Sequence, residues 1–212
     1  MLKTTIALLG SLGFLLSVST TNVFAGAMHG GISGMIGFVE TDGHELEGSA
    51  GEKTTESEGE SFAGASFYAE YEFDNGLGFG AEIFPVDADL GSGKRTDTQD
   101  DESTGDTGAR SASASMEDLY SIYAIWTLEN GYFAKLGHME ADITTTETLP
   151  NSSYGNVSVD GLMYEIGYKA SDNVRFAASY VDFDSINITS SDGVNKISAD
   201  ADAYMFKVSL GF

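Results

Sequence analysis

The amino-acid sequence predicts an all-β protein, an eight-stranded antiparallel up-and-down transmembrane β-barrel. Three observations lead to this fold class: apolar and polar residues alternate with a period of two, the number of such segments is even, and their connections alternate between short and long. The chain has 212 residues with no cysteine and two prolines, which suits one domain and excludes a disulfide framework.

The first 25 residues have the pattern of a removable signal peptide. Lys3 precedes an apolar stretch of about 13 residues, from Ile6 to Val18. A helix needs ~20 apolar residues to span a bilayer, so this stretch is too short for an anchor. Compact residues, Val23 and Ala25, occupy the positions that signal peptidase requires. We therefore predict secretion, with residues 1–25 as signal peptide and residues 26–212 as the barrel.

Alternation is clearest in the last segment of the chain. One face of this segment carries Tyr204, Phe206, Val208, Leu210 and Phe212, while Lys207 and Ser209 fall on the other face. Comparable patterns define eight strands, at roughly residues 28–40, 60–75, 77–87, 115–128, 131–142, 157–169, 174–189 and 196–212. Each is long enough for a membrane-spanning β-strand, which needs ~9–11 residues.

The connections between these strands fall into two classes. Residues 74–76, 129–131 and 171–173 are tight hairpin signals, two of which contain Asn-Gly. The longer connections cover about residues 41–59, 88–114, 143–156 and 189–196. Short turns at one end and long loops at the other are typical of bacterial outer-membrane barrels, whose closure removes unpaired strand edges. We expect extracellular long loops and periplasmic termini.

A secreted soluble β-sandwich or small barrel is the alternative, because it also has one apolar and one polar face. The membrane barrel is favoured because the polar face is rich in Gly and Ser as well as charge, as a cramped, hydrated lumen would be. Tyr and Phe also recur near strand ends, as in interfacial aromatic girdles.

Two segments resemble a known group of proteins. The ending 204–212, with Tyr204, Phe206, Val208, Leu210 and Phe212, resembles the C-terminal signal that the outer-membrane assembly machinery recognises. Residues 67–84 resemble a β-turn-β unit of the small OmpA/OmpX/opacity-type barrels. The resemblance covers the whole of residues 26–212 as a pattern, without a motif specific to one protein. It implies an integral outer-membrane protein that contacts outer-membrane lipids and the assembly machinery.

Charged residues on the predicted inner face are the main candidate site. They are Glu70, Glu72, Glu82, Lys135, Glu165, Lys169, Arg175 and Lys207. The lumen of an eight-stranded barrel is only wide enough to be filled by side chains, and unpaired buried charges are costly. We therefore predict a structural charge network that plugs the lumen. A gated, low-conductance ion path is the alternative, as in a narrow porin-like channel.

Acidic residues dominate the composition, with 33 Asp and Glu against 10 Lys and Arg and a net charge of −23. This charge repels phosphate, so we expect no nucleic-acid partner. The first two long loops are especially acidic, and we expect them to be solvated and mobile. Divalent cations are possible partners there, with weak candidate ligands at Asp97, Asp100, Asp101, Glu102 and Asp106. Because no spacing matches a defined calcium loop, we predict no specific metal site and no cofactor.

The sequence therefore favours a small outer-membrane protein whose barrel anchors acidic surface loops in a structural or surface-interaction role. A narrow porin-like channel for ions or small solutes is the second candidate. An outer-membrane lipid-modifying enzyme is the third and least favoured, since no Ser-His-acid arrangement stands out and His138 with Glu140 is an isolated pair near a strand end.

Overall fold

The computed structural model describes residues 26–47, 52–85, 87–97, 108–148, 153–193 and 195–212. The predicted signal peptide, residues 1–25, lies outside the described residues. None of the described segments forms a helix that is long and apolar enough to cross a bilayer.

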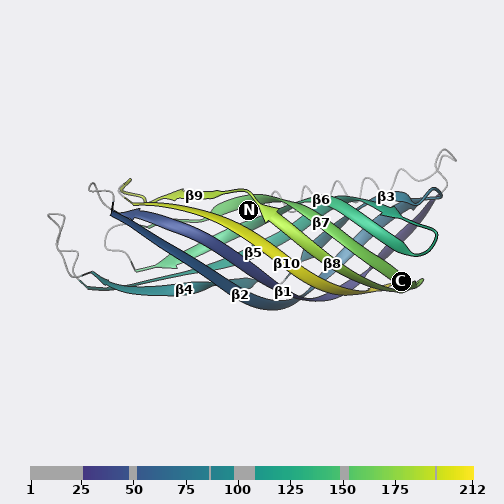
Figure 1. Cartoon of the computed structure of the whole chain (residues 1–212), viewed down its shortest axis with the longest axis horizontal. Helices are drawn as coiled ribbons and strands as arrows, with labels where there is room; N and C mark the ends of the chain where they lie inside the picture. The colour runs from purple at the N-terminus through teal and green to yellow at the C-terminus, as the bar shows by residue number, and fades with distance from the viewer. Residues whose placement is uncertain (1–25, 48–51, 86, 98–107, 149–152, 194) are drawn as a thin grey trace.

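The strands form one closed antiparallel ring. They are β1 (Gly26–Glu47), β2 (Glu52–Phe73), β3 (Leu77–Phe84), β4 (Ala88–Asp97), β5 (Gly108–Thr127), β6 (Tyr132–Glu147), β7 (Val157–Ser171), β8 (Val174–Phe183), β9 (Ile186–Thr189) and β10 (Lys196–Gly211). Strands β3 and β4 pair with successive parts of β5, and β8 and β9 pair with successive parts of β10. The ten strands therefore occupy eight positions around the ring. Pairing of β1 with β10 closes it (Figure 1). The predicted fold class is confirmed.

The strand register shows how strongly the ring is sheared. From Glu40 on β1, the row of paired residues runs through β10, β8, β7, β6, β5, β3 and β2. It returns to β1 at Gly30, a displacement of ten residues. A displaced register of this kind accompanies strands that tilt against the barrel axis. At the closing seam, paired residues such as Gly31 and Gly211 are far apart in sequence.

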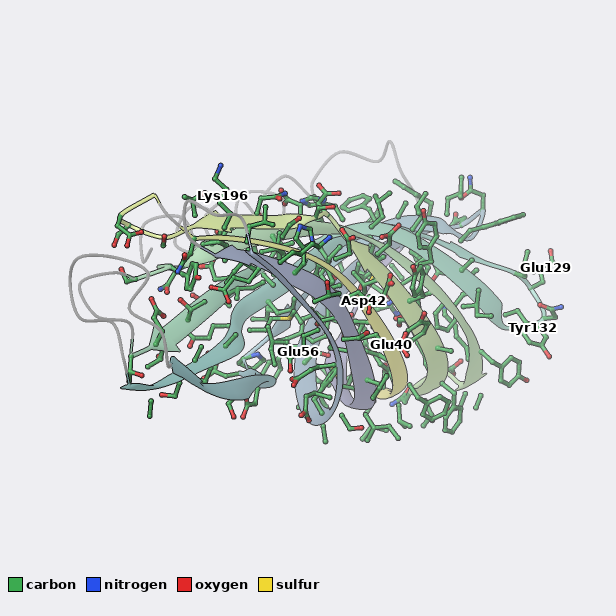
Figure 2. The ribbon with its side chains drawn as sticks, turned by 60° about the vertical axis from the view of Figure 1, so that its left-hand side comes forward. Glu40, Asp42, Glu56, Glu129, Tyr132 and Lys196 are labelled. Carbon is green, nitrogen blue, oxygen red and sulfur yellow. The ribbon has the colours of Figure 1, made fainter. Side chains whose placement is uncertain are left out.

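The two ends of the barrel differ. At one, called the turn end here, β2–β3, β5–β6 and β7–β8 are joined by tight turns; in the first, Gly76 N donates to Phe73 O at 2.9 Å. Glycines at positions 76 and 131 have φ of 79° and 89°, which other residues rarely adopt. Figure 2 shows Glu129 and Tyr132 at this end, opposite Lys196.

The opposite end is built from strands where loops were expected, which corrects the sequence-based prediction. The expected loops 41–59 and 88–114 are mostly paired strand: β1–β2 pairing continues to Glu47 and Glu52, and β4–β5 pairing continues to Asp97 and Gly108. β6 also extends to Glu147, into the expected loop 143–156. Most side chains on both faces of these extensions are polar or small, so hydrophobic alternation fades although backbone pairing continues; Met116 and Ile143, at the base of the extensions, are still buried in the apolar core. We call residues 41–47, 52–60, 88–97, 108–117 and 143–147 the crown.

The outer wall carries an exposed apolar belt. Ile166, with 69% of its surface exposed, lies in it together with other large side chains on every side of the ring. They include Ile32, Ile36, Phe67, Phe79, Ile83, Ile122, Trp126, Leu136, Leu162, Phe176, Phe206 and Leu210. Soluble proteins rarely expose a continuous apolar surface of this extent, whereas hydrocarbon requires one.

Aromatic residues border the belt on both sides. Near the turn end, the Tyr132 and Tyr168 ring centroids are 5.1 Å apart. On the crown side, Tyr180 packs between Tyr164, at 6.2 Å, and Tyr204, at 5.2 Å. Such paired girdles mark the two interfaces of a membrane-spanning barrel.

The lumen has two layers, which corrects the expectation of a hydrated interior throughout. Charged side chains occupy the layer nearer the turn end. Nearer the crown, the inward side chains are apolar. On β6, Met139 lies on the crown side of Lys135, and on β10, Met205 lies on the crown side of Lys207. The apolar layer also includes Met35, Val39, Phe84, Met116, Met163, Val181 and Phe183.

Some inward glycines make room for large rings. A Cβ atom on Gly37 would lie 2.3 Å from Phe62 Cζ, and one on Gly167 would lie 2.3 Å from Phe133 Cζ. These glycines therefore allow aromatic rings to fill the lumen, so a glycine-rich inner face here reflects close packing as much as hydration.

Candidate functional site

Six buried charges form a chain across the lumen in which the sign alternates. In order along the chain they are Arg175, Glu70, Lys135, Glu165, Lys207 and Glu82. Lys135 Nζ lies 2.8 Å from Glu70 Oε1 and 3.2 Å from Glu165 Oε1. The six residues come from β8, β2, β6, β7, β10 and β3, so closure of the ring is required to assemble them. Three positive and three negative groups leave the chain without net charge.

Neutral hydroxyl groups complete the hydrogen bonding of this chain. Tyr123 donates to Glu70 Oε1 at 2.9 Å, and Ser179 donates to Glu165 Oε2 at 2.7 Å. Ser66 donates to Glu82. Burying charges is costly unless they are both paired and hydrogen-bonded, and each of these three carboxylates satisfies both conditions.

The remaining two predicted lumen charges form a separate pair at the turn end. Lys169 Nζ lies 2.6 Å from Glu72 Oε2, with 20% and 17% of the two side chains exposed. The structure therefore places all eight candidate lumen residues inside the ring and brings each against an opposite charge. Sequence reasoning named these residues but not their partners, because partner choice depends on register.

The apolar layer above the charges is closely packed. The hollow among Met35, Phe84, Met139 and Met205 measures about 40 Å³. One water occupies roughly 10–15 Å³ by a comparable measure, so this hollow has room for only a few. In the part of the lumen that the structure describes, ion pairs fill the layer nearer the turn end, and apolar side chains fill the layer nearer the crown.

At the crown, separate connections are tied together across the barrel. The Tyr154 hydroxyl donates to Glu45 on β1, and the Tyr154 backbone N–H donates to Glu147 on β6. Ser191 N donates to Ser153 O at 2.8 Å, which joins the β9–β10 connection to this same β6–β7 connection. These hydrogen bonds hold the connections after β6 and β9 against each other and against β1.

Acidic residues surround the outer wall directly above the belt. We call them the collar: Glu40, Glu117, Glu140, Asp142, Asp160, Asp182, Asp200 and Asp202. Tyr180 of the aromatic girdle donates to Asp202 Oδ1 at 2.6 Å. Of the six Lys and Arg side chains that the structure describes, four lie in the lumen, and the other two, Lys53 and Lys196, lie on crown-end strands. None of these six neutralises the collar.

The weak metal candidates are not brought together in the described residues. Asp97 ends β4, and nothing is described of its side chain; Asp100, Asp101, Glu102 and Asp106 lie outside the described residues. Instead, potential ligand atoms of His138, Glu140 and Asp160 lie within 4.8 Å of one another on the outer wall. Sequence reasoning paired His138 with Glu140 but missed Asp160, because Asp160 joins them only through the pairing of β6 with β7.

The predicted assembly signal lies on the outer wall of β10. Tyr204, Phe206, Val208 and Leu210 point outward within the belt, and Phe212 is 90% exposed. Phe212 N donates to Gly30 O on β1 at 2.9 Å, next to the closing seam. Its recognition by the assembly machinery stays a prediction.

No protein-family model and no curated protein matches this sequence. The structure, in contrast, is similar to solved outer-membrane proteins. OprG from Pseudomonas aeruginosa is 13% identical with a TM-score of 0.53, and the similarity covers 89% of this chain and 98% of OprG. The protease OmpT from Escherichia coli is 8% identical (TM-score 0.45; 92% and 100% covered). Ail, the attachment invasion locus protein of Yersinia pestis, is 17% identical (TM-score 0.37; 89% and 99% covered).

The chain therefore has the fold of a small outer-membrane β-barrel, as the sequence resemblance implied. OprG carries this conclusion, together with the exposed belt and its two girdles. The likeness concerns the fold alone.

Proposed function

We propose that this protein is a non-enzymatic outer-membrane anchor that presents an acidic crown at the cell surface to cationic partners. The observation that carries this proposal is the division of charge. The lumen charges neutralise one another in a buried chain, whereas many acids of the crown and collar are exposed, among them Glu56, Glu58 and Glu60 of the crown and Asp160, Asp182 and Asp200 of the collar. Surface charge of one sign attracts and steers partners of the opposite sign.

The first hairpin of the crown illustrates this surface. Glu56, Glu58 and Glu60 follow one another on the same face of β2, and all three are exposed. Oxygen-rich surfaces of this kind suit divalent cations or cationic segments of another protein. The role is therefore one of surface interaction.

The proposed orientation places the crown outside the cell and the turn end in the periplasm, after removal of residues 1–25. Short periplasmic turns and longer extracellular connections are the rule for barrels of this class. Protease added to intact cells should then cut between residues 95 and 110. Cleavage that occurs only in broken cells would contradict this orientation.

A narrow channel is the second candidate function, supported by one observation. The Glu72–Lys169 pair is partly exposed, so water reaches the charged layer from the turn end. Conduction would require both the ion-pair chain and the apolar layer to open. Purified protein in planar bilayers should therefore be electrically silent, and stable open steps would favour the channel.

The surface role can be tested with a fluorescent decalysine peptide on intact cells that express the protein. The crown variant carries Glu56→Gln, Glu58→Gln and Glu60→Gln. The matched control variant carries Asp74→Asn, Glu129→Gln and Asp172→Asn, three exposed acids of the turn end. Exposed ion pairs contribute roughly 0.2–1 kcal/mol each, so the crown variant should bind at least about threefold more weakly. Unchanged binding by the crown variant, or an equal loss in the control, would contradict the proposal.

A further inference from the structure

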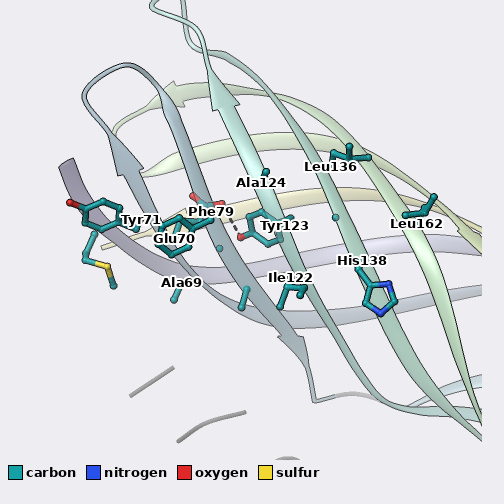
Figure 3. Close-up of a pocket in the computed structure, with 14 residues that line it drawn as sticks. Ala69, Glu70, Tyr71, Phe79, Ile122, Tyr123, Ala124, Leu136, His138 and Leu162 are labelled. Carbon is teal, nitrogen blue, oxygen red and sulfur yellow. Dashed lines mark hydrogen bonds between the residues drawn. The ribbon is translucent and has the colours of Figure 1, made fainter. Parts of the chain in front are cut away.

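The apolar belt is interrupted by a hollow of about 670 Å³ on the outer wall. This volume falls within the ~300–1,000 Å³ of ordinary small-molecule sites. Three alanines create it: Ala69 and Ala81, which are register partners on β2 and β3, and Ala124 on β5. Bulky side chains border it, and Figure 3 shows Tyr71 and His138 at opposite sides. The lining is almost entirely apolar, as expected for a site within the hydrocarbon zone.

The crown side of the hollow has a polar rim. His138 lines the hollow, and its Nε2 lies 3.0 Å from Asp160 Oδ1, with 45% and 55% of the two side chains exposed. Glu140 belongs to the same group and accepts a hydrogen bond from the Tyr120 hydroxyl. Two carboxylates against one imidazole make this rim acidic. It lies at the level of the tyrosine girdle, where lipid headgroups meet the belt.

We propose that this hollow and its rim bind one membrane lipid with a cationic headgroup. The alkyl chain lies over Ala69, Ala81 and Ala124, and the ammonium group lies between Glu140 and Asp160. An ammonium group has three hydrogen-bond donors, enough to reach both carboxylates at once. The apolar floor of the hollow thus matches the alkyl chain of the lipid, and the acidic rim matches its ammonium group.

Charge complementarity decides between this occupant and the other amphiphiles of a membrane. A headgroup whose only charge is a phosphate would meet Glu140 and Asp160 as like charges at close range, which is unfavourable. Among the six Lys and Arg side chains that the structure describes, none lies at this rim to offset that repulsion. The neighbouring collar acids, Asp142 and Asp182, strengthen the preference for a cation.

Native mass spectrometry of the protein in a non-ionic detergent tests this inference. Tetradecylamine is the cationic probe, and tetradecyl sulfate has an equally long chain with an anionic head. The wild type should retain one tetradecylamine per chain and bind it at least about tenfold more tightly than tetradecyl sulfate, because charge-assisted hydrogen bonds favour only the cation. Heat-dependent gel mobility verifies that each variant is folded.

Two variants separate the head and tail contributions. Glu140→Gln with Asp160→Asn removes the acidic rim, and Ala81→Phe fills the floor from outside the barrel. Each should weaken tetradecylamine binding about tenfold. The matched controls are Asp42→Asn with Asp200→Asn, register partners from the crown on β1 and the collar on β10, and Ala178→Phe, an outward alanine of β8 outside the hollow. Both controls should bind as the wild type does.

Three outcomes would overturn the inference. Equal retention of tetradecyl sulfate would show general coating of the belt by amphiphiles. Wild-type affinity in the rim variant would show that the acids do not contribute. One Zn²⁺ bound per chain, lost in the rim variant and without any retention of tetradecylamine, would make the rim a metal site instead.

Discussion

Lys207 Nζ lies 2.9 Å from Glu82 Oε2 inside the barrel, with 2% and 1% of the two side chains exposed. Lys207 also contacts Glu165, so one ammonium group joins two carboxylates from different strands. Because all three groups are buried, removal of one leaves the others without compensation from water. The stability of the barrel should therefore depend on the balance of the whole chain of charges.

Lys207→Met is predicted to destabilise the barrel strongly. It leaves Glu82 without its cation and Glu165 with only Lys135. Breaking a buried pair from one side costs roughly 3–5 kcal/mol, and the free energy of unfolding in detergent micelles should fall by that amount. Lys169→Met, at the turn-end pair, is the control and should cost less than Lys207→Met, because water reaches both side chains of that pair. Equal losses would show that the six-charge chain has no special structural role.

Adding Glu82→Gln to Lys207→Met should recover part of that loss. The double variant removes one charge of each sign and leaves Arg175, Glu70, Lys135 and Glu165 in alternation. Contacting charged residues typically couple by roughly 0.5–3 kcal/mol, so the double variant should be more stable than the sum of the single effects. A double-mutant cycle in urea measures this coupling, and additive losses would contradict it.

Ile166→Arg tests whether the belt faces hydrocarbon. Ile166 lies on β7 between Tyr168 near the turn end and Tyr164 on the crown side. An arginine at the bilayer midplane of a barrel costs roughly 2–4 kcal/mol, and urea unfolding in lipid vesicles should show this loss. Ser57→Arg, on the outer face of the crown, should change stability by less than about 0.5 kcal/mol. A neutral effect of Ile166→Arg would indicate that this wall faces water.

The close approach of Gly167 to Phe133 predicts sensitivity to added side-chain volume. Gly167→Val should displace the Phe133 ring and cost roughly 1–3 kcal/mol, as overpacking of a filled interior does. Gly34→Val is the control, because a Cβ atom on Gly34 meets nothing within 4 Å. Thermal unfolding in micelles compares the two variants, and similar midpoints would mean that the lumen has spare room near Phe133.

Local alternation made the ring and its inward charges predictable from sequence. In 204–212, the two-residue period alone places Phe206 outward and Lys207 inward. It does not reveal that Lys207 meets Glu82, 125 residues away, because that contact depends on the displaced register of the closed ring. Nor does it reveal the crown, where Glu56 pairs with Gly43 although both strand faces meet water. Asp160 was missed because only the pairing of β6 with β7 brings it to His138 and Glu140.

The exposed acids of the collar and crown predict that salt stabilises this barrel. Raising NaCl from about 0.01 M to 0.15 M shortens the Debye length from ~30 Å to ~8 Å, which screens repulsion among exposed carboxylates and leaves the buried ion pairs almost unaffected. The thermal unfolding midpoint should therefore rise with salt. It should rise less in the variant with Glu56→Gln, Glu58→Gln and Glu60→Gln, whose repulsion is already reduced. A midpoint that falls with salt would mean that attraction between exposed charges outweighs the repulsion among these acids.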